Sequence, residues 1–225
     1  MKHKNSHLLV GYWSRLRKGR DVPDQTDIDP RAIKRMLSHI FILEMANPAR
    51  PTYRLAGTSL CDRFGMELKG AGFLTRWDGQ SGTALAALLR QAMKTQQPVC
   101  LSSIGASADC GMVEMETLLL PISFNGGAAS RFLGMTQTLS DAAQLAGRPV
   151  AYQRLIASQF VREDEPLPNS NIPTPSPPGQ IPRNDVRAPH LRLVVSQDRP
   201  TITRFQADQM LQRVFDMVGG TVRPA

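Results

Sequence analysis

The fold is decided by the stretch Thr52-Tyr53-Arg54-Leu55-Ala56-Gly57-Thr58-Ser59-Leu60, in which a strand turns into a helix at a glycine. Side chains alternate between the two faces of a strand, so Tyr53 and Leu55 are expected on the same side of a sheet. Thr58 or Ser59 can cap the helix by accepting a hydrogen bond from a free N–H group of its first turn. The stretch therefore predicts a short strand that meets a helix over one tight corner.

Strands and helices extend from this corner in both directions. The almost wholly apolar segment 41–46 predicts a central strand that pairs antiparallel with the corner strand across a turn at 47–51. Downstream, apolar residues at helical spacing, including Leu85 and Leu89, predict a helix over 82–95. Further strands are expected at 98–104, 112–124 and 131–139. This order of elements predicts an α+β fold with an antiparallel sheet.

An apolar stripe marks the N-terminal segment, where a helix is expected from about residue 6 to residue 18. Leu9, Tyr12, Trp13 and Leu16 recur at steps of three or four residues and would share one face of this helix. Aromatic side chains at such positions are typical anchors of a protein contact. We expect the stripe either to form an association surface or to pack on the sheet of its own domain.

Several short motifs carry a resemblance to a known family. They are Tyr12-Trp13 followed by Leu16-Arg17, Pro23, Asp29-Pro30, Tyr53-Arg54-Leu55-Ala56-Gly57-Thr58, Leu68-Lys69-Gly70 and Glu116-Thr117-Leu118-Leu119-Leu120-Pro121. Together they resemble the small ligand-sensing PAS domains, and more narrowly a bacterial PAS family found largely as stand-alone proteins. The resemblance covers roughly the first two thirds of the chain, and no catalytic residue travels with it.

The resemblance implies a fold and a kind of function. The fold would be a five-stranded antiparallel sheet with helices on one face, in which Arg54, Gly57 and Thr58 form the structural corner motif. The function would be that of a sensory or signalling module that binds a small molecule, a partner protein or both, and that transmits its state by protein contact. We expect an apolar ligand pocket between the sheet and the helices, lined by Tyr53, Leu55, Phe64, Leu85 and Leu89.

The composition changes along the chain and predicts four parts. Residues 1–39 form an N-terminal helical extension and residues 40–145 the PAS-like domain. Residues 146–189 are predicted to be a linker, rich in proline and disordered from residue 166, because proline removes backbone donors. Residues 190–225 add a short strand and an amphipathic helix, in a tail that we expect to be partly disordered.

The overall charge favours acidic partners without identifying one. The formal net charge is +8 and the pI is near 9.9, which keeps a nucleic-acid-associated regulatory protein as the alternative function. Aromatic residues make up only 6% of the chain, fewer than nucleic-acid binding by base stacking usually needs. Neither a secretion signal nor an apolar run long enough to span a membrane is present, so we expect a cytoplasmic protein without membrane insertion.

Residues suited to chemistry are few and scattered, so we expect neither an enzyme nor a metal site. The four histidines, at positions 3, 7, 39 and 190, are not paired at metal-binding spacing. Cys61, Cys100 and Cys110 are interpreted as idle thiols. Glu114 and Glu116 share one face of a strand, which we interpret as a solvated face. The sequence identifies no cofactor.

Overall fold

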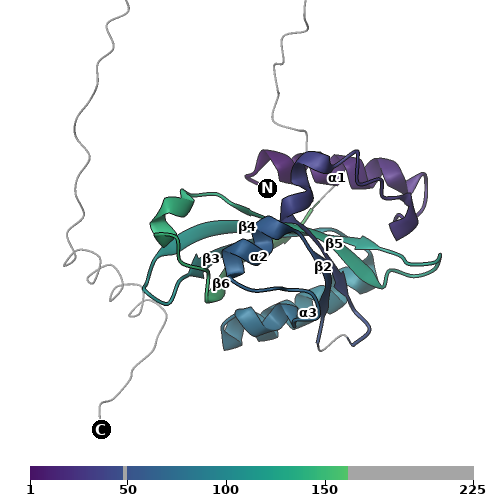
Figure 1. The fold of residues 1–225 in the computed structure, drawn as a ribbon. Helices are drawn as coiled ribbons and strands as arrows, with labels where there is room; N and C mark the ends of the chain where they lie inside the picture. The colour runs from purple at the N-terminus through teal and green to yellow at the C-terminus, as the bar shows by residue number, and fades with distance from the viewer. Residues whose placement is uncertain (48–49, 162–225) are drawn as a thin grey trace, which may run out of the picture. The chain divides into compact units, whose positions relative to one another are not determined.

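A computed structural model describes residues 1–47 and 50–161 of the chain as one antiparallel sheet with helices on both faces (Figure 1). The helices are α1 (Lys4–Arg17), α2 (Thr58–Phe64) and α3 (Gly79–Thr95), with short 3-10 helices η1 (Gln25–Asp27), η2 (Lys34–His39), η3 (Phe73–Arg76) and η4 (Ala142–Leu145). The strands are β1 (Ile40–Glu44), β2 (Thr52–Ala56), β3 (Val99–Ala106), β4 (Met112–Ile122), β5 (Arg131–Thr138) and β6 (Tyr152–Phe160).

The strands lie side by side in the order β2-β1-β5-β4-β3-β6, and every neighbouring pair is antiparallel. This arrangement confirms the predicted α+β fold with its antiparallel sheet. The sheet has one strand more than the five predicted, because β6 pairs with β3 along its whole length. β6 lies in the segment that we assigned to the linker, and its residues are mostly exposed, so it lacks the apolar run by which the other strands are recognised.

The sheet separates two apolar clusters. The inner cluster lies between the sheet and α2, η3 and α3, and includes Phe41, Leu85, Leu101 and Phe132. The outer cluster lies on the other face, where α1 packs, and includes Leu9, Trp13, Leu118 and Leu133. Figure 1 shows α1 on one side of the sheet and α3 on the other. The N-terminal extension thus covers the face that a PAS-like segment with helices on one side would leave open.

A bulge in β2 corrects one expectation about the corner. Leu43 pairs with Tyr53 and Ile42 pairs with Leu55, so Arg54 is an extra residue in the ladder. A bulge interrupts the alternation of side chains. Tyr53 is accordingly buried while Leu55 is 49% exposed, and the two do not share the inner face as predicted.

The corner itself depends on a close approach of two backbone segments. Gly57 has a φ of −73° and is the N-cap of α2, so no left-handed conformation is involved. A Cβ atom there would lie 2.3 Å from the carbonyl oxygen of Leu37 and 2.5 Å from that of Ser38. The expected side-chain cap is absent because α2 already begins at Thr58. Glycine is therefore needed at this position for space.

Other helix starts also differ from the sequence-based prediction. Asp78 caps α3 by accepting a hydrogen bond from the backbone N–H of Ser81, so this helix begins at Gly79 and not at the predicted residue 82. The Ser81 hydroxyl accepts a hydrogen bond from the backbone of Leu155 in β6, at 2.9 Å. The beginning of α3 is thereby fastened to the added strand. The predictions for residues 162–225, including the proline-rich linker from 166 and the tail segment 190–225, concern residues outside those that the structure describes.

Candidate functional site

Four aromatic rings fill the centre of the inner face. Phe41 lies 5.4 Å from Tyr53 and 6.2 Å from Phe73 between ring centroids, and Phe73 lies 5.9 Å from Trp77. A Cβ atom at Gly134 would lie 2.2 Å from the Phe41 ring, so only glycine leaves room for that ring above β5. The protein's own side chains therefore occupy the middle of the region between the sheet and the inner helices.

Four of the five residues that we predicted for a ligand pocket meet on this inner face. Tyr53, Phe64, Leu85 and Leu89 are all buried in the inner cluster, whereas Leu55 is exposed for the reason given above. Burial raises the pKa of the Tyr53 hydroxyl, which therefore stays protonated. That these four residues line a ligand pocket stays a prediction.

A group of polar side chains lies at one end of the inner face. Among the described residues, the buried atoms without a hydrogen-bond partner are Nη1 of Arg63, Nε1 of Trp77, Oγ of Ser103 and Oε1 of Gln153. Trp77, Ser103 and Gln153 are 7%, 2% and 2% exposed. Buried polar groups are nearly always hydrogen-bonded, to protein or to ordered water. Trp77, Ser103 and Gln153 are therefore the nearly fully buried residues of this list, each with a polar atom that lacks a partner among the described residues.

On the outer face, α1 packs on its own sheet. Leu9, Tyr12 and Trp13 are buried in the outer cluster, and Leu16 is partly buried against it. The Trp13 indole nitrogen donates a hydrogen bond of 2.7 Å to the carbonyl of Pro121 in β4. Packing on the same domain, one of the two alternatives we considered, accounts for these contacts, and an association surface on the four residues stays a prediction. An amphipathic stripe alone does not tell which sheet it covers.

A buried carboxylate holds the beginning of α1 on the sheet. Glu116 of β4 accepts hydrogen bonds from the backbone N–H groups of Lys2 and His3, at 2.5 and 3.1 Å, and from the hydroxyl of Ser6, at 2.6 Å. Burial would raise the pKa of Glu116, but these hydrogen bonds outweigh it and lower the pKa. Glu116 is 1% exposed, so its expected place on a solvated face is wrong, although Glu114 is exposed.

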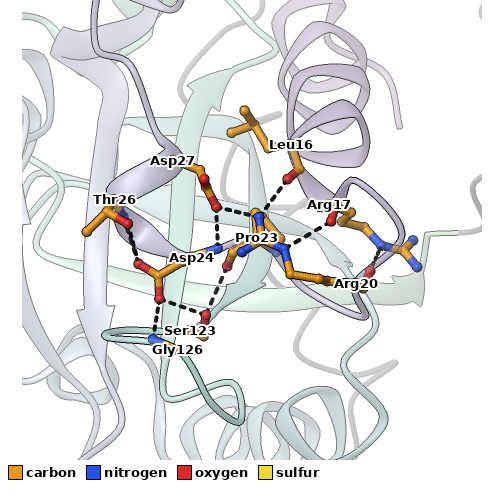
Figure 2. A network of polar contacts seen from close by, with 9 residues as sticks. All are labelled: Leu16, Arg17, Arg20, Pro23, Asp24, Thr26, Asp27, Ser123 and Gly126. Atoms are coloured by element: carbon orange, nitrogen blue, oxygen red, sulfur yellow. Dashed lines mark hydrogen bonds and ion pairs between the residues drawn. The ribbon is translucent and has the colours of Figure 1, made fainter.

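A second buried carboxylate, Asp24, fixes the loop after α1 (Figure 2). It accepts hydrogen bonds from the backbone N–H groups of Gly126, at 2.8 Å, and Thr26, at 2.9 Å, and from the hydroxyl of Ser123, at 3.0 Å. The bond from Gly126 contributes most to lowering the pKa of Asp24. Figure 2 shows that this network ties the loop to the turn between β4 and β5. We assign both carboxylates to holding the N-terminal extension in place.

Exposed apolar side chains lie on the outer face where the end of β3 meets the beginnings of β4 and β6. Met112 of β4 and Tyr152 of β6 both pair with Ala106 of β3, so the three residues form one row on the same face. Met112 is 44% exposed and Tyr152 is 51% exposed. Ile104, next on this face of β3, is half-buried. We name Met112, Ile104 and Tyr152 the outer patch.

Other candidate residues carry less chemistry. In the part of the chain that the structure describes, no three histidine, cysteine or acidic side chains lie close enough to hold a metal ion. Cys61 is half-buried on α2, Cys100 is buried and Cys110 is exposed, and none of the three forms a disulfide bond within the described residues. Burial, together with the charge of Arg63, lowers the pKa of His39.

Two observations concern surfaces. None of the described helices is both long and apolar enough to cross a membrane. Arg15, Lys18, Lys34 and Arg35 are exposed basic residues near the end of α1 and in η2. Association with nucleic acid through such residues stays a prediction.

Comparisons with solved structures give remote likenesses to light-oxygen-voltage (LOV) domains. A LOV domain studied with a flavin analogue is 12% identical, with a TM-score of 0.40 over 52% of this chain and 87% of that chain. The LOV protein of Rhodobacter sphaeroides is 16% identical, with a TM-score of 0.39 over 51% of this chain and 70% of that chain. The LOV domain of Aureochrome1 in its dark structure is 11% identical, with a TM-score of 0.39 over 51% of this chain and 84% of that chain.

No curated protein matches the sequence. A family model described as "PAS domain" matches residues 1–137, which include α1, the corner between β2 and α2, and strands β1 to β5 almost to the end of the fifth. The matched range contains every motif on which we based the resemblance, from Tyr12 to Pro121. Since 137 of the 225 residues are matched, the chain belongs to the PAS domain family.

Proposed function

We propose that this PAS domain is a sensory module that binds a small molecule on the inner face of its sheet and transmits its state by contact with a protein partner. Membership of the PAS family supports a sensory role, since such domains commonly bind small molecules and mediate protein contacts. The expectation that the protein is not an enzyme is part of this proposal.

The observation that carries the proposal is the outer patch. α1 covers the outer face over Leu118 and Leu133, but Met112 and Tyr152 remain about half exposed on the same sheet. Apolar side chains gathered on one face favour a protein contact, and tyrosine and methionine are enriched in such contacts. The partner is either a second copy of this chain or another protein that places apolar side chains on this row.

The strands that carry the patch also carry the polar group of the inner face. Tyr152 and Gln153 are consecutive in β6, and Ser103 and Ile104 are consecutive in β3. Because successive side chains point to opposite faces, each strand has one residue directed inward and its neighbour directed outward. A molecule bound inside would therefore touch the same two strands that meet the partner.

The proposal is tested by photo-crosslinking in the producing cell. A photoreactive phenylalanine analogue replaces Tyr152 in the outer patch, and in a matched control it replaces Arg90, which is exposed on α3 at the other face. We expect a crosslinked protein, or a crosslinked dimer of this chain, from position 152 and none from position 90. Equal crosslinking from both positions, or none from position 152 in a folded protein, would refute a partner contact at this patch.

Light scattering of the purified full chain then identifies the partner type. A dimer that Tyr152→Asp converts to a folded monomer assigns the contact to a second copy. A chain that is monomeric at every concentration, with a crosslink from position 152, assigns it to another protein. The substitution is suited to this test because half of the Tyr152 side chain is already exposed, so the domain core does not depend on it.

A further inference from the structure

Three uncharged polar groups that have no hydrogen-bond partner within residues 1–47 and 50–161 lie together where β3, β6 and the beginning of α3 meet. The backbone of Trp77 forms a parallel bridge with Gln153, and Gln153 pairs in turn with Gly105 of β3. Ser103 is two residues from Gly105 and therefore points to the same face. Trp77, Gln153 and Gly105 thus form one row across the sheet. Ser103 is the diagonal neighbour of Gln153, and side chains at this spacing on one face can interact.

This group faces the inner side of the sheet. Leu101, two residues before Ser103 on β3, belongs to the inner cluster, and so does Trp77. Leu155, two residues after Gln153 on β6, packs against the same cluster. The polar atoms of Trp77, Ser103 and Gln153 are thus surrounded by apolar side chains, where an unmade hydrogen bond costs more free energy than it does near water.

The three groups are complementary in what they offer. The indole N–H of Trp77 only donates, Oε1 of Gln153 only accepts, and the hydroxyl of Ser103 can do either. None of them is ionisable in the ordinary range of pH. A molecule that satisfies them needs one donor and one acceptor, and it needs to be uncharged, because a buried ion would lack a counter-charge in this group.

We propose that Trp77, Ser103 and Gln153 form the recognition site for a small uncharged molecule that presents both a hydrogen-bond donor and an acceptor, such as a carboxamide or an alcohol. This inference rests on the proposed function, of which it names the ligand class and the residues. Gln153 lies beyond residue 137, where the match to the PAS family model ends, so the site uses a strand that the family match does not include.

The test is extraction of small molecules from natively purified full-length chain, followed by mass spectrometry. The variant is Ser103→Ala with Gln153→Met, which removes two polar groups at nearly constant shape. The matched control is Ser102→Ala with Gln159→Met, the same changes on the same two strands at positions that face outward. We expect an uncharged compound in the wild type and the control, and at least a tenfold loss in the variant.

A second measurement covers a ligand that is lost during purification. Thermal unfolding is followed in 100 mM acetamide and in 100 mM acetate, which have nearly the same shape but differ in charge. We expect acetamide to raise the Tm of the wild type more than acetate does, and the difference to vanish in the variant. If the double variant does not fold, Trp77→Phe, which keeps an aromatic ring and removes the donor, takes its place in both measurements.

The possible results separate a failure of this recognition site from a failure of the proposed function. The inference is overturned if a compound is present equally in wild type and variant, if the compound is charged, or if no compound is found and acetamide acts no differently from acetate. In the first of these cases a small molecule is still bound, so the proposed function stands while this site fails. In the last case ordered water occupies the site, whereas crosslinking at Tyr152 reports on the partner contact independently.

Discussion

Replacing Gly57 by alanine is expected to destabilise the domain, because the added methyl group would overlap two backbone carbonyls. Its Cβ atom would lie 2.3 Å from the oxygen of Leu37 and 2.5 Å from both the carbon and the oxygen of the Ser38 carbonyl. The obstacles are backbone atoms, which cannot rotate away as a side chain does. Gly57 also donates a hydrogen bond of 2.8 Å to Ile40, so moving the corner outward would lengthen that bond.

The size of the effect follows from two opposing contributions. Overpacking of this kind typically costs about 1–3 kcal/mol. Alanine offsets roughly 0.4–1 kcal/mol of it by reducing the conformational entropy of the unfolded chain, since φ at Gly57 is compatible with alanine. The difference is a net loss of about 1.3 kcal/mol, which corresponds to a decrease in Tm of roughly 3–5 °C for a domain of this size.

Urea unfolding followed by tryptophan fluorescence measures this loss. Both tryptophans of the chain, Trp13 and Trp77, are buried, one on each face of the sheet, so the signal reports on both clusters. Gly79→Ala is the control, because a Cβ atom at that position meets nothing within 4 Å and Gly79 begins α3. Gly57→Ala with the same urea midpoint as the wild type would show that the corner is not limited by space.

Three further changes test the buried polar groups. Glu116→Gln should cost about 1–3 kcal/mol and increase hydrogen exchange in α1, since the charged acceptor of its first residues is lost; Glu114→Gln, at an exposed position on the same strand, should change neither quantity by a comparable amount. Asp24→Ala should cost about 2 kcal/mol in urea unfolding, because it leaves buried donors of the loop and of the turn between β4 and β5 unpaired. His39 has a pKa lowered by burial, so the folded state binds fewer protons than the unfolded state, and stability should fall as the pH drops below the ordinary histidine pKa; in His39→Gln the decrease in Tm between pH 7 and pH 5 should be smaller, and an unchanged decrease would contradict this assignment.

Local patterns predicted much of the fold. The corner, the strands β1 to β5 and the helices α1 and α3 follow from alternation, helical spacing and turn residues, which are properties of neighbouring residues. The position of Leu55 did not follow, because the bulge at Arg54 is a property of the pairing between β2 and β1 rather than of β2 alone. Pattern and register are thus different kinds of information, and only the first is contained in a short window of sequence.

The roles of the buried polar residues were missed for a related reason. Glu116 binds the backbone of residues more than a hundred positions away, so its environment depends on where α1 docks. Asp24 is likewise completed by Ser123 and Gly126 from a distant turn. One signal was available for Glu116, since it precedes a long apolar run in the motif Glu-Thr-Leu-Leu-Leu-Pro, where the strand is buried on both faces.

β6 is an inconspicuous segment of the sequence, yet it carries one residue of the proposed recognition site. As the last strand in the order, it lies beside β3, and the backbone oxygen of Gln153 accepts a hydrogen bond of 2.9 Å from the N–H of Asp78, while Ser81 binds Leu155. These contacts join the first turn of α3 to the edge of the sheet. They also explain why the only fully buried polar side chain of β6 is Gln153, whose neighbour Tyr152 points to the opposite face. The polar and exposed residues of β6, which suit the two proposed contacts, are also the reason that this strand is hard to recognise in the sequence.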